Sequence, residues 1–177
     1  ARGALLIVDE IQAGLGRTGR WFAYQHAGIT PDMVTLGKGL AGGLPMGAVC
    51  WRGSLGTLDE GAHGSTFGGN PLTSAAAIAT LNTLRDAHLI THSAESGAQL
   101  IESLRALNLP SVREVRGLGL MIGLELRDRV TPALKALQAR GVLALPAGVN
   151  VLRLLPPLVI DDAARESLVE SVREVLA

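Results

Sequence analysis

Short apolar runs separated by glycine-rich segments make up the first third of the chain. Each run is continuous rather than alternating, as in a strand covered on both faces. The first run, Leu5–Val8, ends abruptly in Asp9 and Glu10. The pattern predicts strands over Leu5–Val8, Met33–Leu36 and Gly47–Trp51, with a short helical piece over Phe22–His26. Strands that alternate in this way with loops and helices predict an α/β layer structure.

Helical spacing becomes dominant after residue 70. Asn70 followed by Pro71 is a strong helix-start signal, and that helix should reach about Arg85. A polar cluster over residues 86–96 predicts a domain boundary, giving domains 1–88 and 89–177. In the second part, the pattern predicts helices over Leu89–Leu107, from Thr131 to Gly141, and after the capping pair Asp161-Asp162. It predicts strands over Val112–Arg116, Leu118–Leu126 and Val149–Leu155. The first two of these strands are expected to join at Gly117. This mixture predicts a small α+β domain.

Composition excludes several classes of function. The 177 residues carry no formal net charge and only 3% aromatic side chains, which argues against nucleic-acid binding. No apolar run approaches membrane-spanning length. Cys50 is the single cysteine, so we expect a cytoplasmic protein without an intrachain disulfide, and the four histidines share no metal-ligand spacing. Because the chain starts inside an apparent core strand, we expect an N-terminal part of the protein to precede it.

Lys38 is the first candidate for chemistry. Lysine is scarce, with Lys38 and Lys135 the only two, while arginine supplies the other positive charges. A lysine between glycines at a strand end suggests an amine that loses its proton and attacks a carbonyl, which arginine cannot do. An ordinary exposed loop lysine is the alternative. Asp9, at the end of another strand, is either a site residue or a helix-capping or ion-pairing residue.

Two segments match the glycine fingerprint of dinucleotide-binding folds, residues 14–19 and 37–42. That fingerprint requires a helix directly behind its glycines, and Gly43 and Pro45 block one after the second segment. A nicotinamide-dependent oxidoreductase is therefore a weak alternative. Ser65 and Thr66 lie before the helix that starts near Asn70, where hydroxyl and amide groups suit a phosphate, although an ordinary capped loop would look the same.

Taken together, the motifs resemble the class III pyridoxal-phosphate aminotransferases. The matching motifs are Val8–Gln12, Gly14–Gly19, Pro31-Asp32, Gly37–Gly39 with Gly42-Gly43, Ser65–Pro71, Val115–Met121 and Leu152–Leu158. They span the chain in family order. The resemblance implies fold type I of the pyridoxal-phosphate-dependent transferases, with part of the large mixed-sheet α/β domain followed by the small C-terminal α+β domain.

The resemblance also implies roles around the cofactor. Lys38 would hold pyridoxal 5'-phosphate (PLP) through its amine and, once released, move the proton between substrate and cofactor carbons, for which a partly buried lysine beside cations is suited. Asp9 would keep the pyridine nitrogen protonated. Ile11 would pack on the ring face and Gln12 would bind the ring hydroxyl.

The remaining implied roles concern the substrate and a second subunit. Arg153 would grip the substrate α-carboxylate with its planar guanidinium, the alternative being an arginine paired with a neighbouring acid. Thr66 would reach the phosphate of the partner's cofactor, with Ser65 near the substrate, so that a homodimer would share its active sites. Arg17 and Arg116 are expected to be structural.

Within the family, the sequence most resembles the acetylornithine aminotransferases and their relatives in lysine biosynthesis, which act on an aminoadipate semialdehyde attached to a small acidic carrier protein. The implied reaction moves a terminal amino group between such a precursor and 2-oxoglutarate or glutamate. Other ω-aminotransferases, acting on ornithine or 4-aminobutyrate, and a non-catalytic remnant are the alternatives.

Overall fold

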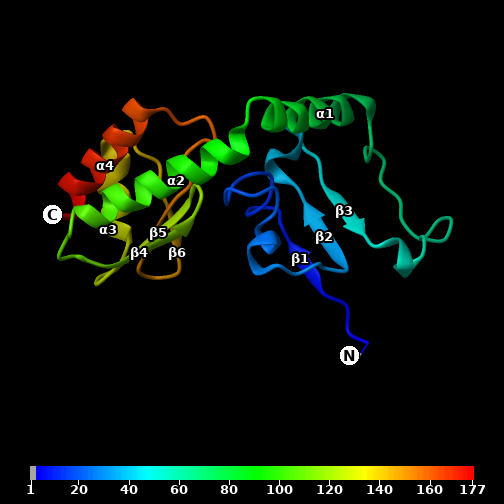
Figure 1. Ribbon diagram of the computed structural model, residues 1–177, viewed down its shortest axis with the longest axis horizontal. Coiled ribbons are helices and arrows are strands. Elements are labelled where there is room, and N and C mark those ends of the chain that lie inside the picture. The colour runs from blue at the N-terminus through cyan, green and yellow to red at the C-terminus, as the bar shows by residue number, and fades with distance from the viewer. Residues whose placement is uncertain (1–2) are drawn as a thin grey trace.

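A computed structural model describes residues 3–177 (Figure 1). The strands are β1 (Ile7–Asp9), β2 (Met33–Leu36), β3 (Ala48–Trp51), β4 (Val112–Leu118), β5 (Met121–Leu126), β6 (Leu145–Ala147) and β7 (Val151–Leu154). The α-helices are α1 (Pro71–Asp86), α2 (Leu89–Ala106), α3 (Thr131–Ala139) and α4 (Asp162–Leu176), and the 3-10 helices are η1 (Ala23–Ala27), η2 (Lys38–Ala41) and η3 (Gly53–Leu55).

The first sheet is mixed and has the strand order β1-β2-β3. β1 and β2 run parallel, and β3 pairs antiparallel with β2. All three predicted strands are present; β2 has its predicted bounds, and the bounds of β1 and β3 differ by one or two residues. The parallel register places Asp9 opposite Thr35, so the carboxyl ends of β1 and β2 meet at the same edge of the sheet.

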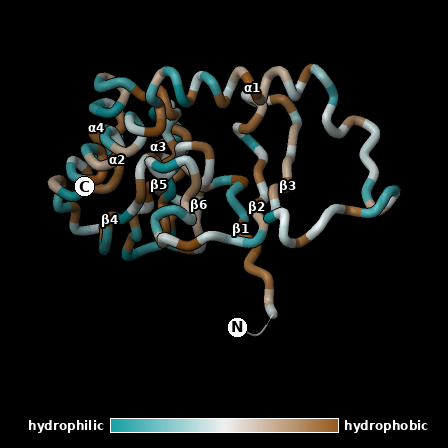
Figure 2. Tube along the Cα trace, turned by 45° about the vertical axis from the view of Figure 1, so that its right-hand side comes forward, coloured by the Kyte–Doolittle hydropathy of each residue, from teal (hydrophilic) through white to brown (hydrophobic). Residues whose placement is uncertain are grey.

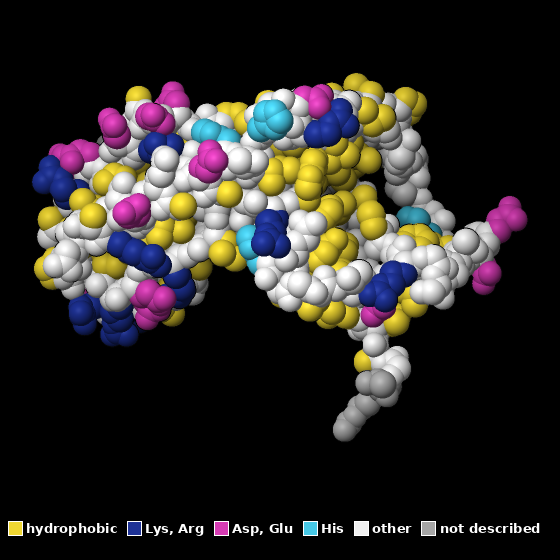
Figure 3. Space-filling view, in the orientation of Figure 1, with side chains coloured by type: hydrophobic (Ala, Val, Ile, Leu, Met, Phe, Trp, Pro, Cys, Tyr) yellow, Lys and Arg dark blue, Asp and Glu magenta, His cyan; other side chains and the backbone are white. Residues whose placement is uncertain are grey.

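The expectation that the first strand is covered on both faces is wrong for the part of the chain that the structure describes. Leu5 and Ile7 are 52% and 58% exposed. Figure 3 shows a broad hydrophobic area on this half of the molecule, beneath α1. The apolar run signals a strand suited to burial, but hydrophobicity alone does not say which segments cover it.

α1 packs against the segments that follow β1 and β2. Asn70 caps it as predicted, since its side chain accepts a 3.0 Å hydrogen bond from the Thr73 amide. On the inner face, Ala77 and Leu84 are buried against residues of the loop after β1 and of η2, namely Leu15, Leu40 and Ala41. α1 therefore fixes the backbone on either side of Lys38.

The second sheet is antiparallel, with the order β4-β5-β7-β6 (Figure 1). α2 and α3 contact its strands, and α4 packs against these two helices. Its core alternates along β5, where Ile122 and Leu124 are almost fully buried. Buried leucines of α2 and α3 and Val172 of α4 complete the same cluster. Brown segments of the tube gather accordingly inside this half in Figure 2.

Two details of this sheet differ from prediction. β4 and β5 join at Gly119 and Leu120 rather than at Gly117, which lies inside β4. β6, which has Pro146 at its centre, was not predicted. Proline cannot donate a ladder hydrogen bond, and β6 tolerates it as an edge strand paired with β7 alone.

The helices of this half begin and end close to their predicted bounds. Asp161 accepts a 2.8 Å hydrogen bond from the Ala164 amide and caps α4. His88, in the left-handed region with φ 53°, separates α1 from α2. The division into domains 1–88 and 89–177 stays a prediction. Within residues 3–177, no helix is both long enough and apolar enough to cross a bilayer.

Candidate active site

Asp9 and Lys38 come from neighbouring parallel strands at their carboxyl ends. Asp9 is the last residue of β1, and Lys38 follows the end of β2 by two residues. Ligands of α/β sheets gather outside this edge. Because β1 and β2 pair in parallel, Asp9 and Lys38 lie at the same edge of the sheet although they are far apart in sequence.

The Asp9 carboxylate is oriented by two hydrogen bonds. Its Oδ1 accepts from the Ile11 amide at 2.9 Å and from the Thr35 hydroxyl at 3.2 Å. Within residues 3–177 the second oxygen, Oδ2, makes no hydrogen bond. Asp9 is exposed, so this oxygen is available to a ligand at the sheet edge.

The neighbouring acid, Glu10, has a different role. Its side chain is buried, and its two oxygens accept from the amides of Ala23 and Tyr24 at 2.9 and 2.8 Å. It thereby binds the first turn of η1. Of the two acids at the end of the apolar run, Glu10 therefore binds the helix, and Asp9 remains the site candidate.

Lys38 has a left-handed backbone, with φ 47°, and opens η2. Its side chain is exposed, so the described residues do not supply the partial burial that was expected for a lysine base. It lines a small cavity of about 170 Å³. The lining comes from three segments: residues 11–17, residues 37–39, and Leu155 with Leu158. Ile11 and Gln12 therefore line the same cavity as Lys38, and their roles at a cofactor stay predictions.

Gln12 and Arg153 are in direct contact although 141 residues separate them. Arg153 Nη1 donates to Gln12 Oε1 at 2.8 Å. Arg153 also lines a second, larger cavity of about 540 Å³ between β4, β5, β7 and the loop after β1. Its Nε atom is buried and has no hydrogen-bond partner among the described residues, and no acid there forms an ion pair with it. The sequence alternative of an acid-paired arginine is therefore not what the structure shows.

Arg17 joins the loop after β1 to the second sheet. Its guanidinium donates to the carbonyl oxygens of Leu120 and Pro156, and its own carbonyl accepts from Leu120 N at 3.0 Å. Burial lowers the pKa of Arg17 from its ordinary value. Arg17 is thus the loop organiser that was predicted.

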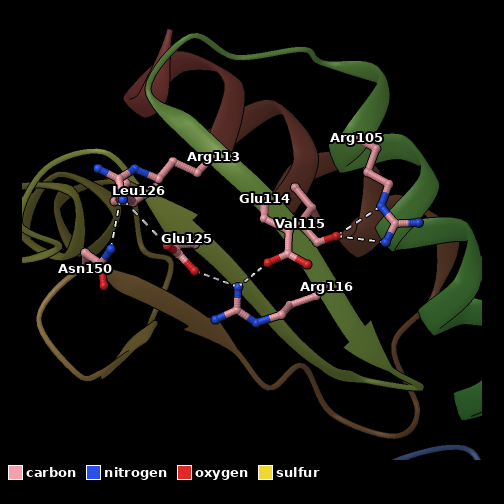
Figure 4. Close-up of polar contacts among 8 residues, drawn as sticks. All are labelled: Arg105, Arg113, Glu114, Val115, Arg116, Glu125, Leu126 and Asn150. Carbon is pink, nitrogen blue, oxygen red and sulfur yellow. Dashed lines mark hydrogen bonds and ion pairs between the residues drawn. The ribbon is translucent and has the colours of Figure 1, made fainter.

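Arg116 is held by two acids on the surface of β4 and β5 (Figure 4). It donates to Glu114 at 2.6 Å and to Glu125 at 2.9 Å. These hydrogen bonds, with Glu125 the larger contributor, raise the pKa of Arg116. Its predicted structural role agrees with these contacts.

Ser65 and Thr66 lie apart from this group. Both are exposed in the loop between η3 and α1, and neither lines the cavity beside Lys38. The structure therefore does not bring them together with Asp9, Gln12 and Lys38. Their expected role at a partner's cofactor stays a prediction.

The glycine segments lack the helix that a dinucleotide fold needs. Residues 14–19 form consecutive turns, and the next element is the five-residue η1. After the second segment, η2 ends at Ala41 and two left-handed glycines follow. Neither glycine segment is therefore followed by the helix that a nicotinamide-dependent oxidoreductase would need there.

Solved structures of aminotransferases share this fold. Ornithine aminotransferase from Toxoplasma gondii superposes with a TM-score of 0.90 at 36% identity, covering 98% of this chain and 42% of that one. Among curated proteins, the chain is 46% identical to acetylornithine aminotransferase of Bacillus subtilis over 176 residues, 98% of this chain and 46% of that protein. It is 45% identical to LysW-aminoadipate semialdehyde transaminase of Deinococcus radiodurans over 177 residues, 99% of this chain and 41% of that protein.

The fold is that of the PLP-dependent aminotransferases, fold type I. The sequence profile described as Aminotransferase class-III matches residues 1–176, and the chain belongs to that family. It spans less than half the length of the relatives it matches. Members of this family are transaminases that use PLP.

The residues at the sheet edge fit this cofactor chemically. PLP needs an amine for its aldehyde, an anion for its ring nitrogen and a polar partner for its ring hydroxyl. Lys38, the Asp9 carboxylate and the Gln12 amide are groups of these three kinds, and Ile11 lines the same cavity as Lys38 and Gln12; their roles at a cofactor stay predictions. Sequence reasoning missed Thr35, which orients Asp9. Its only signal was its place one residue before the end of the second apolar run.

Proposed function

We propose that this chain belongs to an aminotransferase that moves a terminal amino group between N-acetylornithine, or a carrier-bound lysine precursor, and 2-oxoglutarate or glutamate. The observation that carries the proposal is that Asp9 ends β1 and Lys38 follows the end of β2, so that both lie at the edge where the carboxyl ends of these two paired parallel strands meet. The similarity to relatives of both named activities supports it.

Each residue would contribute a separate part of the chemistry. PLP, when bound, withdraws electrons from the carbon that bears the amino group. Lys38 would bind the cofactor and carry the proton at its Nζ atom, while Asp9 would hold a proton on the ring nitrogen through its unbonded oxygen. Arg153 would bind the α-carboxylate, because its buried Nε lacks a hydrogen-bond partner within the described residues.

The partner and location belong to the same proposal. A homodimer would place Thr66 and Ser65 of one subunit at the other's site, and their exposure leaves them accessible for this. A small acidic carrier protein is a further partner if the lysine precursor is the substrate. We propose a cytoplasmic enzyme, in keeping with the single cysteine of this chain, which leaves no intrachain disulfide within it.

The test is borohydride reduction of the full-length gene product loaded with PLP, followed by peptide mass mapping. A pyridoxyl adduct on the peptide that contains Lys38 is expected, and none should form with Lys38→Ala. An unmodified Lys38 in a folded, cofactor-supplied protein would reject the proposal.

A second substrate candidate is ornithine, because the Toxoplasma ornithine aminotransferase shares the fold at 36% identity. Assays with ornithine, N-acetylornithine and the carrier-bound precursor as competing donors separate these activities. The proposal expects kcat/KM to be higher for one of the two blocked amines than for ornithine.

A further inference from the structure

The turn after β7 supplies part of the apolar wall of the cavity beside Lys38. Leu155 and Leu158 line that cavity and come from the second half of the chain, whereas the other lining residues come from the loops after β1 and β2. The turn is closed by a 3.0 Å hydrogen bond from the Ile160 amide to the Pro157 carbonyl oxygen. Leu158 can therefore line the cavity only while this turn keeps its place.

Arg17 fixes the start of the turn. Its guanidinium donates to the carbonyl oxygen of Pro156, across from the loop after β1. The carbonyl oxygen of Arg17 in turn accepts a 3.2 Å hydrogen bond from the hydroxyl of Ser93, a fully buried residue of α2. α2 thus sets the position of the arginine that binds the turn.

His92, the neighbour of Ser93 on α2, fixes the end of the turn. Its Nε2 atom lies 2.9 Å from the carbonyl oxygen of Ile160, a residue that is only 4% exposed. Because a carbonyl oxygen can only accept, Nε2 is the donor in this contact. The hydroxyl of Ser96 lies 3.3 Å from the same nitrogen and accepts a 3.1 Å hydrogen bond from Arg165 of α4. His92 therefore joins α2 to the end of the turn.

The action of His92 on the cavity must pass through the turn. The described lining of the cavity does not include His92. Leu158 packs against the buried cluster that contains Leu15, and a Cβ atom on Gly16 would lie 3.7 Å from Leu158 Cδ1. Since close-packed side chains transmit displacements to their neighbours, a turn released at Ile160 would shift Leu158 in the cavity wall.

We propose that His92 is a positioning residue for the cofactor cavity: together with Arg17, it fixes the turn that places Leu158 in the cavity wall. This inference rests on the proposed function, since it takes the cavity beside Lys38 as the place where PLP binds. An apolar wall that is held in one position contributes contacts to a ligand and keeps water away from it. Loss of the His92 hydrogen bond then weakens PLP binding although His92 itself does not line the cavity.

The test measures the dissociation constant of PLP by spectrophotometric titration of the full-length gene product freed of its cofactor. His92→Leu removes the donor to the Ile160 carbonyl oxygen, whereas His92→Gln keeps a donor of similar reach. Each variant is made in the wild type and in a Leu158→Ala background. Gln99→Leu, at an exposed position of the same helix, is the matched control.

His92→Leu is expected to weaken PLP binding about fivefold, the effect of losing one typical hydrogen bond. His92→Gln and Gln99→Leu should stay within about twofold of the wild type, the range expected of uncoupled changes. In the Leu158→Ala background, His92→Leu should also have less than about a twofold effect, because the side chain to be positioned is gone.

Three results would overturn the inference. They are unchanged PLP binding in His92→Leu, equal weakening with and without Leu158, and a loss in His92→Gln as large as in His92→Leu. A lower melting temperature of the cofactor-free His92→Leu protein with an unchanged PLP constant would assign His92 a structural role alone.

The proposed function fails separately, through an unmodified Lys38 and absent amino transfer. A protein that transfers amino groups but shows no coupling between His92 and Leu158 retains its function and loses only this role of His92.

Discussion

Gly97 of α2 and Gly119 of the β4–β5 turn are packed backbone against backbone. A Cβ atom on Gly97 would lie 2.0 Å from the carbonyl oxygen of Gly119. On its other side Gly119 lies against the loop after β1, where its own Cβ would be 2.6 Å from Gly19 N. The turn is therefore held between α2 and the loop that carries Gln12 and Arg17.

Gly97→Ala should lower the free energy of unfolding by about 3 kcal/mol, because the added methyl group would force two backbones apart. The gain in helix propensity, about 1 kcal/mol, is too small to compensate. The shift of the urea midpoint measures the effect. Ala98→Gln, exposed on the same helix, should change stability by less than about 1 kcal/mol. Equal stability of wild type and Gly97→Ala would contradict the packing described.

Lys38→Arg should lower kcat for amino transfer by about 10³-fold or more. A guanidinium keeps its proton at working pH and can neither react with the cofactor aldehyde nor carry the proton in turnover. Steady-state assays of the PLP-loaded full-length protein give kcat. Lys135→Arg, the same exchange at the only other lysine, lies exposed on α3 and should leave kcat unchanged. Comparable losses in both variants would point to a general effect on folding instead.

Glu10→Ala should destabilise the protein by about 1–2 kcal/mol, since the partly buried amides of Ala23 and Tyr24 would lose both acceptors. Glu10→Gln keeps one acceptor and should cost less. Thermal unfolding of the three proteins gives the order wild type, Glu10→Gln, Glu10→Ala. The reverse order of the two variants would show that packing rather than hydrogen bonding decides this position.

Asn70→Ala should lower stability by about 1 kcal/mol through loss of the α1 cap. Asn70→Asp retains the acceptor for the Thr73 amide and should recover most of that loss. Asn82→Ala, exposed in the same helix, is the control and should be neutral or slightly stabilising. Denaturant titration compares all three. If Asn70→Ala were as stable as Asn82→Ala, the cap would contribute nothing.

Local signals account for what the sequence predicted well. The caps at Asn70 and Asp161 act within three residues, and the structure has both. The ordered motifs also indicated the family, whose profile matches residues 1–176. The strand ends at Asp9 and Lys38 were found from the apolar runs that precede them.

Long-range packing accounts for what the sequence did not predict. The acceptor of Arg153 is Gln12, 141 residues away, and no local pattern joins them. The β4–β5 turn lies at Gly119 because α2 and the loop after β1 enclose it from both sides. β1 has a run typical of a covered strand, yet Ile7 is 58% exposed, since coverage depends on other segments.

The left-handed backbone at Lys38 has a consequence for descent. A side chain at φ 47° costs about 1 kcal/mol, which glycine would not incur. At position 38, lysine is therefore less favourable for the backbone than glycine would be. If selection for amino transfer were lost, replacement of Lys38 by glycine would relieve this backbone strain. A glycine at position 38 would then indicate that the reaction had been lost while the rest of the fold was still intact.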